Sequence, residues 1–242
     1  MTGFRPTYLT IAIVSVSLCT NFGTIPARAL QLDAATVIQR VDAAVKARVD
    51  SIQGYTVTEH YAVYRNNDEI HPAAEMTVKT TYQKETGKNY EILSQQGSSI
   101  LRNLVLGAIL DNEKHINQPG VREGSWFISA NYEMKLQPGG TQQLDGRECY
   151  LLAITPRRKA PYLIEGTLWV NAKDGSIVQI QGTASKSSSF LTGPTKVMRK
   201  YTNVNGFAEA THARAESDSL LFGRTVVTID YQDYQIQLRP RQ

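Results

Sequence analysis

The chain is dominated by short runs in which hydrophobic and polar residues alternate, the pattern of β-strands with one buried face. Tyr162 to Gly182 shows it most clearly, because two alternating runs flank an Asp174–Gly175 turn and predict a β-hairpin. Gly adopts the positive φ of such a turn freely and Asp tolerates it. Further turn pairs separate runs rich in Val, Ile, Thr and Tyr: Thr86–Gly87, Gly139–Gly140, Asp145–Gly146 and Asn205–Gly206.

Strands are predicted over most of the chain, and several have one apolar and one polar face. One solvent-exposed face per strand favours an antiparallel sheet over a parallel sheet, which is buried on both sides. In the first strand of the central hairpin, we expect Tyr162, Ile164, Leu168 and Val170 on the buried concave face and Leu163, Glu165, Thr167 and Trp169 on the other. The predicted strands are residues 55–65, 75–83, 88–94, 131–136, 148–155, 162–170, 177–184, 196–204, 207–216 and 225–236.

Two segments have helical periodicity instead. Residues 33–51 carry apolar residues on one face, with Asp33 as a plausible N-cap and Gly54 expected to end the helix. Residues 98–112 are apolar around most of their circumference, with Arg102 and Asn103 as the main polar positions. A helix of that kind needs cover on more than one side, so we expect it to insert against the concave face of the sheet.

The N-terminus has the features of an export signal. Arg5 precedes an apolar stretch from Leu9 to Leu18, and Ala27-Arg28-Ala29 is an A-x-A cleavage site. We therefore expect a cleaved signal peptide over residues 1–29 and a single domain over residues 30–242, located in the periplasm. An uncleaved anchor and a lipoprotein acylated at Cys19 are the alternatives; bulky Leu18 stands where lipoprotein cleavage prefers a small residue.

Charge and cysteine content narrow the class of protein. The formal net charge of +4 falls to about +2 when Arg5 and Arg28 leave with the leader, and the remaining positive residues are dispersed. Nucleic-acid binding therefore has no support. Cleavage leaves Cys149 as the one cysteine, so an internal disulfide is impossible and the core must be stabilised by apolar burial. Within its strand, Cys149 is expected to be a buried, inert thiol.

Sequence motifs for catalysis are mostly absent. The chain has no G-x-S-x-G, H-E-x-x-H, Walker A or paired C-x-x-C motif, and its four histidines lack metal-ligand spacing. Asp230 and Asp233 are separated by an odd number of residues, which predicts opposite faces of a strand. Trp126 and Trp169 suit packing in a core or interface, with ligand stacking as the alternative. No enzyme, cofactor or metal is expected.

The order of elements resembles a known family. The matching segments are residues 166–182 (GTLWVNAKDGSIVQIQG), residues 201–206 (YTNVNG) and residues 226–234 (VVTIDYQDY), behind a leader, an N-terminal helix and an apolar helical insertion. This pattern resembles the outer-membrane lipoprotein-sorting family of LolA-like periplasmic carriers. The resemblance implies an α+β fold, an unclosed antiparallel half-barrel whose concave face is covered by helices, with acyl chains bound between sheet and helices.

The functional expectation follows from that arrangement. The chain is expected to be a non-enzymatic periplasmic carrier of a lipid, a lipoprotein acyl chain or a similar apolar ligand, with an envelope protein as a possible partner. Burial of alkyl chain would drive binding, at roughly 0.8 kcal/mol per CH₂. The alternative is an envelope interaction or regulatory module whose concavity is filled by its own side chains. Candidate residues for the apolar cavity are Leu101, Leu104, Val105, Ala108, Leu168, Ile180, Val227 and Ile229.

Overall fold

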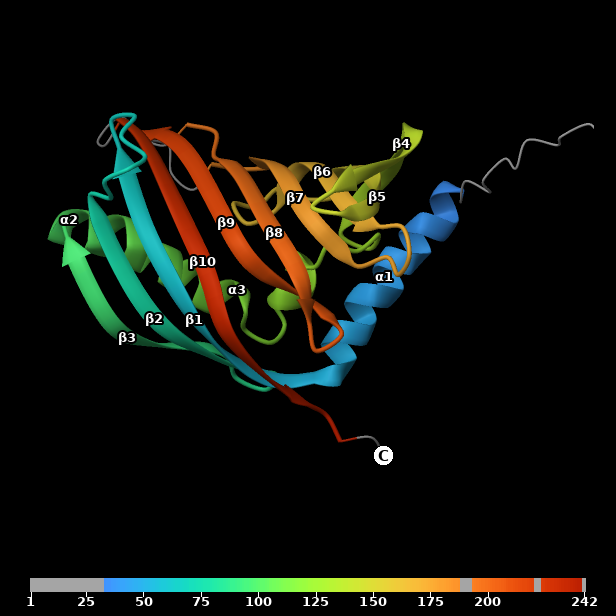
Figure 1. The fold of residues 1–242 in the computed structure, drawn as a ribbon, viewed down its shortest axis with the longest axis horizontal. Coiled ribbons are helices and arrows are strands. Elements are labelled where there is room, and N and C mark those ends of the chain that lie inside the picture. Colours follow the sequence, from blue (N-terminus) through green and yellow to red (C-terminus); the bar gives the residue numbers. More distant parts are fainter. Residues whose placement is uncertain (1–32, 188–192, 220–222, 241–242) are drawn as a thin grey trace, which may run out of the picture. The chain divides into compact units, whose positions relative to one another are not determined.

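The structure is a computed structural model that describes residues 33–187, 193–219 and 223–240. The predicted leader lies outside these residues. The described residues form a ten-stranded antiparallel sheet in the order β3-β2-β1-β10-β9-β8-β7-β6-β5-β4 (Figure 1). The strands are β1 (Ile52–Arg65), β2 (Ala74–Gln83), β3 (Gly87–Gly97), β4 (Tyr132–Leu144), β5 (Arg147–Pro156), β6 (Ile164–Asn171), β7 (Ile177–Ala184), β8 (Lys196–Val204), β9 (Phe207–Ser219) and β10 (Gly223–Leu238).

The sheet curves without closing. In the part of the chain that the structure describes, β3 and β4 are its two edges and do not pair with each other. The predicted unclosed antiparallel half-barrel is therefore confirmed (Figure 1). Among the described helices, none is both long and apolar enough to cross a bilayer.

The N-terminal helix α1 (Ala34–Ser51) begins as predicted. Asp33 is its N-cap, and the Asp33 side chain accepts a hydrogen bond from the Thr36 amide at 2.8 Å. The prediction that Gly54 ends the helix is wrong. The helix ends at Ser51, because Ile52 already takes an extended conformation and pairs with Leu238 in the sheet.

The apolar insertion is helical, but its face differs from the prediction. It comprises α2 (Ser99–Leu101), the π-helical segment η1 (Arg102–Gly107) and α3 (Ala108–Ile116). The buried leucines are Leu101, Leu106 and Leu110, whereas Leu104 is 60% exposed. A π-helical turn contains one more residue than an α-helical turn, so a leucine five positions after Leu101 faces the sheet. A short 3₁₀ turn, η2 (Arg122–Ser125), follows this insertion.

Both helical segments cover the same face of the sheet. Cross-strand partners place Tyr61, Ile229 and Ala213 on one face, and the same rows continue through Arg199, Ile180 and Leu168 to Leu152. Val37 and Val41 of α1 pack on the β4–β7 part of this face. The three buried leucines of residues 99–116 pack on the part formed by β1, β2, β9 and β10.

The central hairpin has the predicted register over β6. Ile164, Leu168 and Val170 are buried, and Glu165 is exposed on the opposite face. Tyr162 and Leu163 precede the strand, so alternation does not apply to them: Leu163 is fully buried although the pattern put it on the wet face. The connection between β6 and β7 is a longer loop and not a tight two-residue turn. Within this loop the Gly175 amide donates a hydrogen bond to the Asn171 carbonyl at 2.9 Å.

The other turn pairs divide into three groups. Thr86–Gly87, between β2 and β3, has positive φ at the glycine alone. Asp145–Gly146 and Asn205–Gly206 have positive φ at both residues, which is the conformation of a type I′ hairpin turn, as predicted. Gly139 and Gly140 were expected to separate two strands, and this is wrong because both lie inside β4. The pairing with β5 shifts register between Leu136 and Thr141, so these glycines form an irregular bulge in an edge strand.

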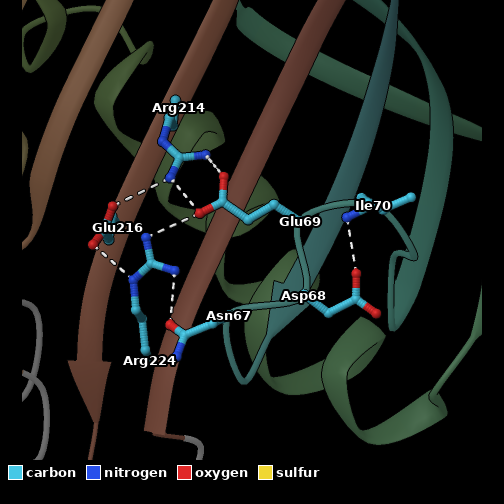
Figure 2. A network of polar contacts seen from close by, with 7 residues as sticks. All are labelled: Asn67, Asp68, Glu69, Ile70, Arg214, Glu216 and Arg224. Carbon is cyan, nitrogen blue, oxygen red and sulfur yellow. Dashed lines mark hydrogen bonds and ion pairs between the residues drawn. The ribbon is translucent and has the colours of Figure 1, made fainter.

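A polar network links the β1–β2 connection to β9 and β10 (Figure 2). The carboxylate of Glu69 accepts hydrogen bonds from Arg214 at 2.8 and 3.0 Å and from Arg224 at 2.9 Å. Glu216 accepts from the same two arginines at 3.2 and 2.9 Å. The Asn67 side chain adds a contact of 3.0 Å from Arg224. Because each of these charged side chains has an oppositely charged partner within the chain, we assign the network a structural role: it holds the β1–β2 connection against β9 and β10.

Cys149 is expected to resist thiol reagents in the folded protein. Its side chain is fully buried, and burial raises the pKa of the thiol, so little reactive thiolate forms. Native protein treated with iodoacetamide should carry no label on the Cys149 peptide by mass spectrometry, whereas urea-unfolded protein should be labelled there fully. Rapid labelling of the native protein would contradict the burial of this side chain.

Candidate functional site

A cavity of about 420 Å³ lies on the concave face, in the gap between the two covering helices. Its walls come from α1, from the end of α3 and the following turn, from the β6–β7 loop, and from strands β1, β2, β3, β7, β8, β9 and β10. Cavities of this size accommodate small organic ligands. It is larger than a neighbouring cavity within the described residues and is our candidate functional site.

One wall of the cavity is apolar. Helix α1 contributes Ala44, Val45 and Val49, and the segment after η2 contributes Trp126 and Phe127. The neighbouring cavity, of about 340 Å³, shares Val45, Val49 and Trp126 with the first. Trp126, for which the sequence left packing or ligand stacking open, therefore stands between the two cavities.

Contacts with the rest of the chain hold α1 in place as this wall. The Asp42 carboxylate accepts hydrogen bonds from the amide and the hydroxyl of Ser129 at 2.8 and 2.5 Å. Arg40 donates to the Ala172 carbonyl at 3.1 Å, and Lys84 donates to the Val49 carbonyl at 2.8 Å. The apolar wall is thus fixed along the helix and at its C-terminal end.

The cavity also contains paired charges. Arg48 of α1 donates two hydrogen bonds to the carboxylate of Glu209 on β9, at 2.8 and 2.7 Å. Such a two-bond arginine–carboxylate pair is among the strongest polar contacts in proteins. Burial alone would lower the pKa of Arg48, but the charge of Glu209 outweighs burial and raises the pKa above its usual value. Arg48 therefore remains charged inside the cavity.

A second charged group joins α3 to the sheet. Lys88 Nζ lies 2.9 Å from Glu113 Oε2, and Arg199 Nη2 lies 3.6 Å from Glu113 Oε1. Burial alone would raise the pKa of Glu113, but the charges of Lys88 and Arg199 bring it down to about 2. Burial alone would lower the pKa of Lys88, and Glu113 reverses this and raises it well above its usual value. All three groups stay charged at neutral pH.

Glu59 completes the polar lining. It projects from β1 onto the concave face and is only 1% exposed. The Tyr61 hydroxyl donates to Glu59 Oε2, whereas Glu59 Oε1 has no hydrogen-bond partner. Several tyrosines surround these charges: Tyr55, Tyr82, Tyr201, Tyr231 and Tyr234. Burial raises the pKa of each of them, so their hydroxyls remain neutral.

The eight residues predicted from the sequence lie elsewhere. Leu101, Val105, Val227 and Ile229 come together, in the cluster between residues 99–116 and the sheet. Leu168 and Ile180 belong to the other cluster, beneath α1. Leu104 and Ala108 face solvent because of the π-helical turn. None of the eight lines the cavity, and their role as ligand contacts stays a prediction.

The charged lining was missed although one of its members was visible in the sequence. Glu59 occupies the same face of its strand as Tyr55, Val57, Tyr61 and Val63, and a single carboxylate in an apolar row signals a buried charge. The pairing of the other charged residues could not be predicted in this way, because the two members of each ion pair lie in different elements.

A bulge in β10 also changes the lining. Asp233 has a φ of +56°, and the pairing with β1 shifts register between Thr56 and Thr58. The extra residue lets Tyr231 and Tyr234 both reach the cavity despite their odd separation. The simple alternation used to place Asp230 and Asp233 on opposite faces is therefore interrupted between them. Asp230 Oδ1 lies 2.7 Å from His212 Nδ1.

These features define the class of structure: an open antiparallel half-barrel with two helical covers and a cavity between them. Solved structures of similar fold include a LolA superfamily protein from Nitrosomonas europaea, with 14% identity, a TM-score of 0.45, and coverage of 86% of this chain and 96% of that chain. A DUF1329 family protein from Desulfovibrio piger gives 15% identity, a TM-score of 0.42, and coverage of 83% and 93%.

A putative outer membrane lipoprotein-sorting protein domain from Vibrio parahaemolyticus is also similar, with 10% identity, a TM-score of 0.44, and coverage of 85% and 94%. No family model matches the chain, and no curated protein matches it.

Proposed function

We propose that this protein is a non-enzymatic binding or carrier protein of the periplasm that holds a lipid, a lipoprotein acyl chain or a similar ligand in the cavity on its concave face. The observation that carries the proposal is the cavity itself, whose α1 wall is lined by Ala44, Val45 and Val49. Transfer of alkyl groups from water to such a wall contributes roughly 0.8 kcal/mol per CH₂.

Filling the cavity is expected to abolish binding. Ala44→Trp would place an indole in the space that the ligand needs, and a fluorescent acyl probe should bind at least about tenfold more weakly than to wild type. Ala43→Trp is the matched control, because Ala43 lies on the exposed side of the same helix. Equal probe affinity in both variants would place the binding site outside this cavity.

The natural ligand is best sought in protein purified from its own envelope. Native mass spectrometry should show a mass increment that disappears after lipid extraction, and the extract then identifies the molecule. Protein that carries no increment and binds no acyl probe would contradict the carrier proposal.

One observation favours the second candidate, an envelope interaction module. The space beneath residues 99–116 is filled by the chain's own side chains. Ile92 and Leu93 on edge strand β3, and Ile100 and Leu104 just after it, are about half or more exposed. Exposed apolar residues beside an open sheet edge are a feature of protein-binding surfaces. This candidate takes precedence if wild-type protein binds no acyl probe.

A further inference from the structure

The carboxylate of Glu59 is the least satisfied charged group of the cavity. The Tyr61 hydroxyl satisfies Oε2, but Oε1 is buried without a hydrogen-bond donor. The nearest cation is Lys88, whose Nζ lies 4.0 Å from Oε1, beyond hydrogen-bond distance. Buried polar atoms in folded proteins nearly always have a partner, so an exception that lines a cavity points to a ligand or a bound water.

Among the described residues, no side chain donates a hydrogen bond to Glu59 Oε1, and the buried Tyr90 hydroxyl is likewise without a partner. Lys88 donates to Glu113 at 2.9 Å, and moving it toward Glu59 would break this bond. Tyr234 donates to the Ala210 carbonyl at 3.0 Å. Glu59 Oε1 therefore presents a strong, fixed acceptor to whatever occupies the cavity.

The charge of the cavity decides what kind of donor fits. Among the described residues, positive and negative side chains balance in the lining: Arg48, Lys88, Arg122 and Arg199 stand against Glu59, Glu113, Asp174 and Glu209. A charged ligand would bring an uncompensated charge into a buried site, which is costly. A neutral donor satisfies Glu59 without that cost.

We propose that the cavity selects a ligand with a neutral hydroxyl head group, which donates a hydrogen bond to Glu59 Oε1 while the alkyl chain lies along Val45 and Val49 of α1. This inference rests on the proposed function and specifies its ligand class: hydroxylated lipids such as acylglycerols, in preference to free fatty acids or alkylamines.

The first test compares ligands with one alkyl chain and different heads on wild-type protein. Monolaurin, methyl laurate, laurate and dodecylamine compete with a fluorescent acyl probe. Monolaurin should bind about tenfold tighter than methyl laurate, which lacks a donor, and tighter than either charged ligand. Equal affinity of monolaurin and methyl laurate would overturn the inference and assign Glu59 Oε1 to a bound water. Tightest binding of laurate would overturn it as well.

The second test changes the acceptor. Glu59→Gln removes one negative charge and should reduce monolaurin affinity about tenfold, leave methyl laurate unchanged, and increase laurate affinity because the cavity then carries one excess positive charge. A merely structural role of Glu59 would weaken all ligands alike, and that result would overturn the inference. Glu91→Gln, on the exposed face of β3, is the control and should match wild type.

The outcomes separate this inference from the proposed function. If the four ligands bind with equal affinity whatever their head group, the carrier proposal stands and the proposed preference for a hydroxyl head group is wrong. Failure of all four ligands to bind removes both. If Glu59→Gln does not fold, the ranking of the four ligands on wild-type protein decides the question by itself.

Discussion

Replacement of Glu113 by alanine is expected to lower the free energy of unfolding by about 3–5 kcal/mol, the range for removing one partner of a buried ion pair. Glu113 is 15% exposed and faces Lys88, which is 9% exposed, and Arg199. Without the carboxylate, Lys88 remains buried with Glu59 at 4.0 Å as its nearest anion. Urea unfolding followed by circular dichroism measures the change.

Two controls identify the cause. Glu133→Ala removes the exposed partner of Lys135 and should cause no measurable loss, because exposed pairs contribute little. The double variant Lys88→Met/Glu113→Leu replaces the pair with apolar side chains and should recover part of the stability. A Glu113→Ala protein as stable as wild type would show that the buried pair does not stabilise the fold.

The same carboxylate gives the stability a defined pH dependence. The pKa of Glu113 is about 2 in the folded protein, against 4.5 ordinarily. Because the pKa of Glu113 is lower in the folded protein than in the unfolded chain, its ionised carboxylate stabilises the fold fully when the pH is above the unfolded pKa. This stabilisation is lost as the pH falls toward the pKa of the folded protein. Wild type should therefore lose about 3 kcal/mol between pH 4.5 and pH 2 from this group. The gap in stability between wild type and Glu113→Ala should narrow over that range, and a constant gap would contradict the assignment.

The second large effect is expected at Gly175, where alanine should cost about 2–4 kcal/mol. Its φ is +75°, a conformation that side chains disfavour. A Cβ there would also lie 2.6 Å from the backbone carbonyl of Arg40 on α1. Relief of that contact requires α1 to move away from the β6–β7 loop. Since Asp174 and Ser176 line the cavity, acyl-probe binding should weaken as well.

The variant Gly146→Ala separates the cost of the backbone conformation from the cost of the contact with Arg40. Gly146 has a φ of +74°, but a Cβ at this position would meet no other atom within 4 Å. Its loss of stability therefore reports the cost of the backbone conformation alone, and the excess at Gly175 reports the contact with Arg40. Equal losses at both glycines, measured by urea unfolding, would show that the loop and α1 do not constrain each other.

Local patterns were sufficient to predict the sheet and the first helix. Asp33 caps α1, and alternation in β6 assigns Leu168 and Glu165 to opposite faces, because these features depend on neighbours a few residues away. The same rules failed at the π-helical turn, where one extra residue exposes Leu104 and buries Leu106. They also failed at the β10 bulge, where the φ of Asp233 breaks the alternation.

The cavity was out of reach for a different reason. Five of its charged side chains lie on five different elements and meet only when the sheet curves: Arg48, Glu59, Lys88, Glu113 and Arg199. Pairing between such distant residues has no local periodicity. Apolar residues at helical spacing therefore predicted an apolar groove beneath residues 99–116. In the structure the chain's own side chains fill that space, and the cavity, with its mixed polar and apolar lining, lies beside α1.

The strand order also has a consequence for when the chain can fold. β1 and β10 are neighbours in the interior of the sheet, although β1 begins at Ile52 and β10 at Gly223. The first strand thus gains its second neighbour only when the last strand is present, and contacts so far apart in sequence form slowly. A growing chain therefore stays incomplete until synthesis has nearly ended. For the exported protein that we propose, this delay favours passage through the membrane before folding.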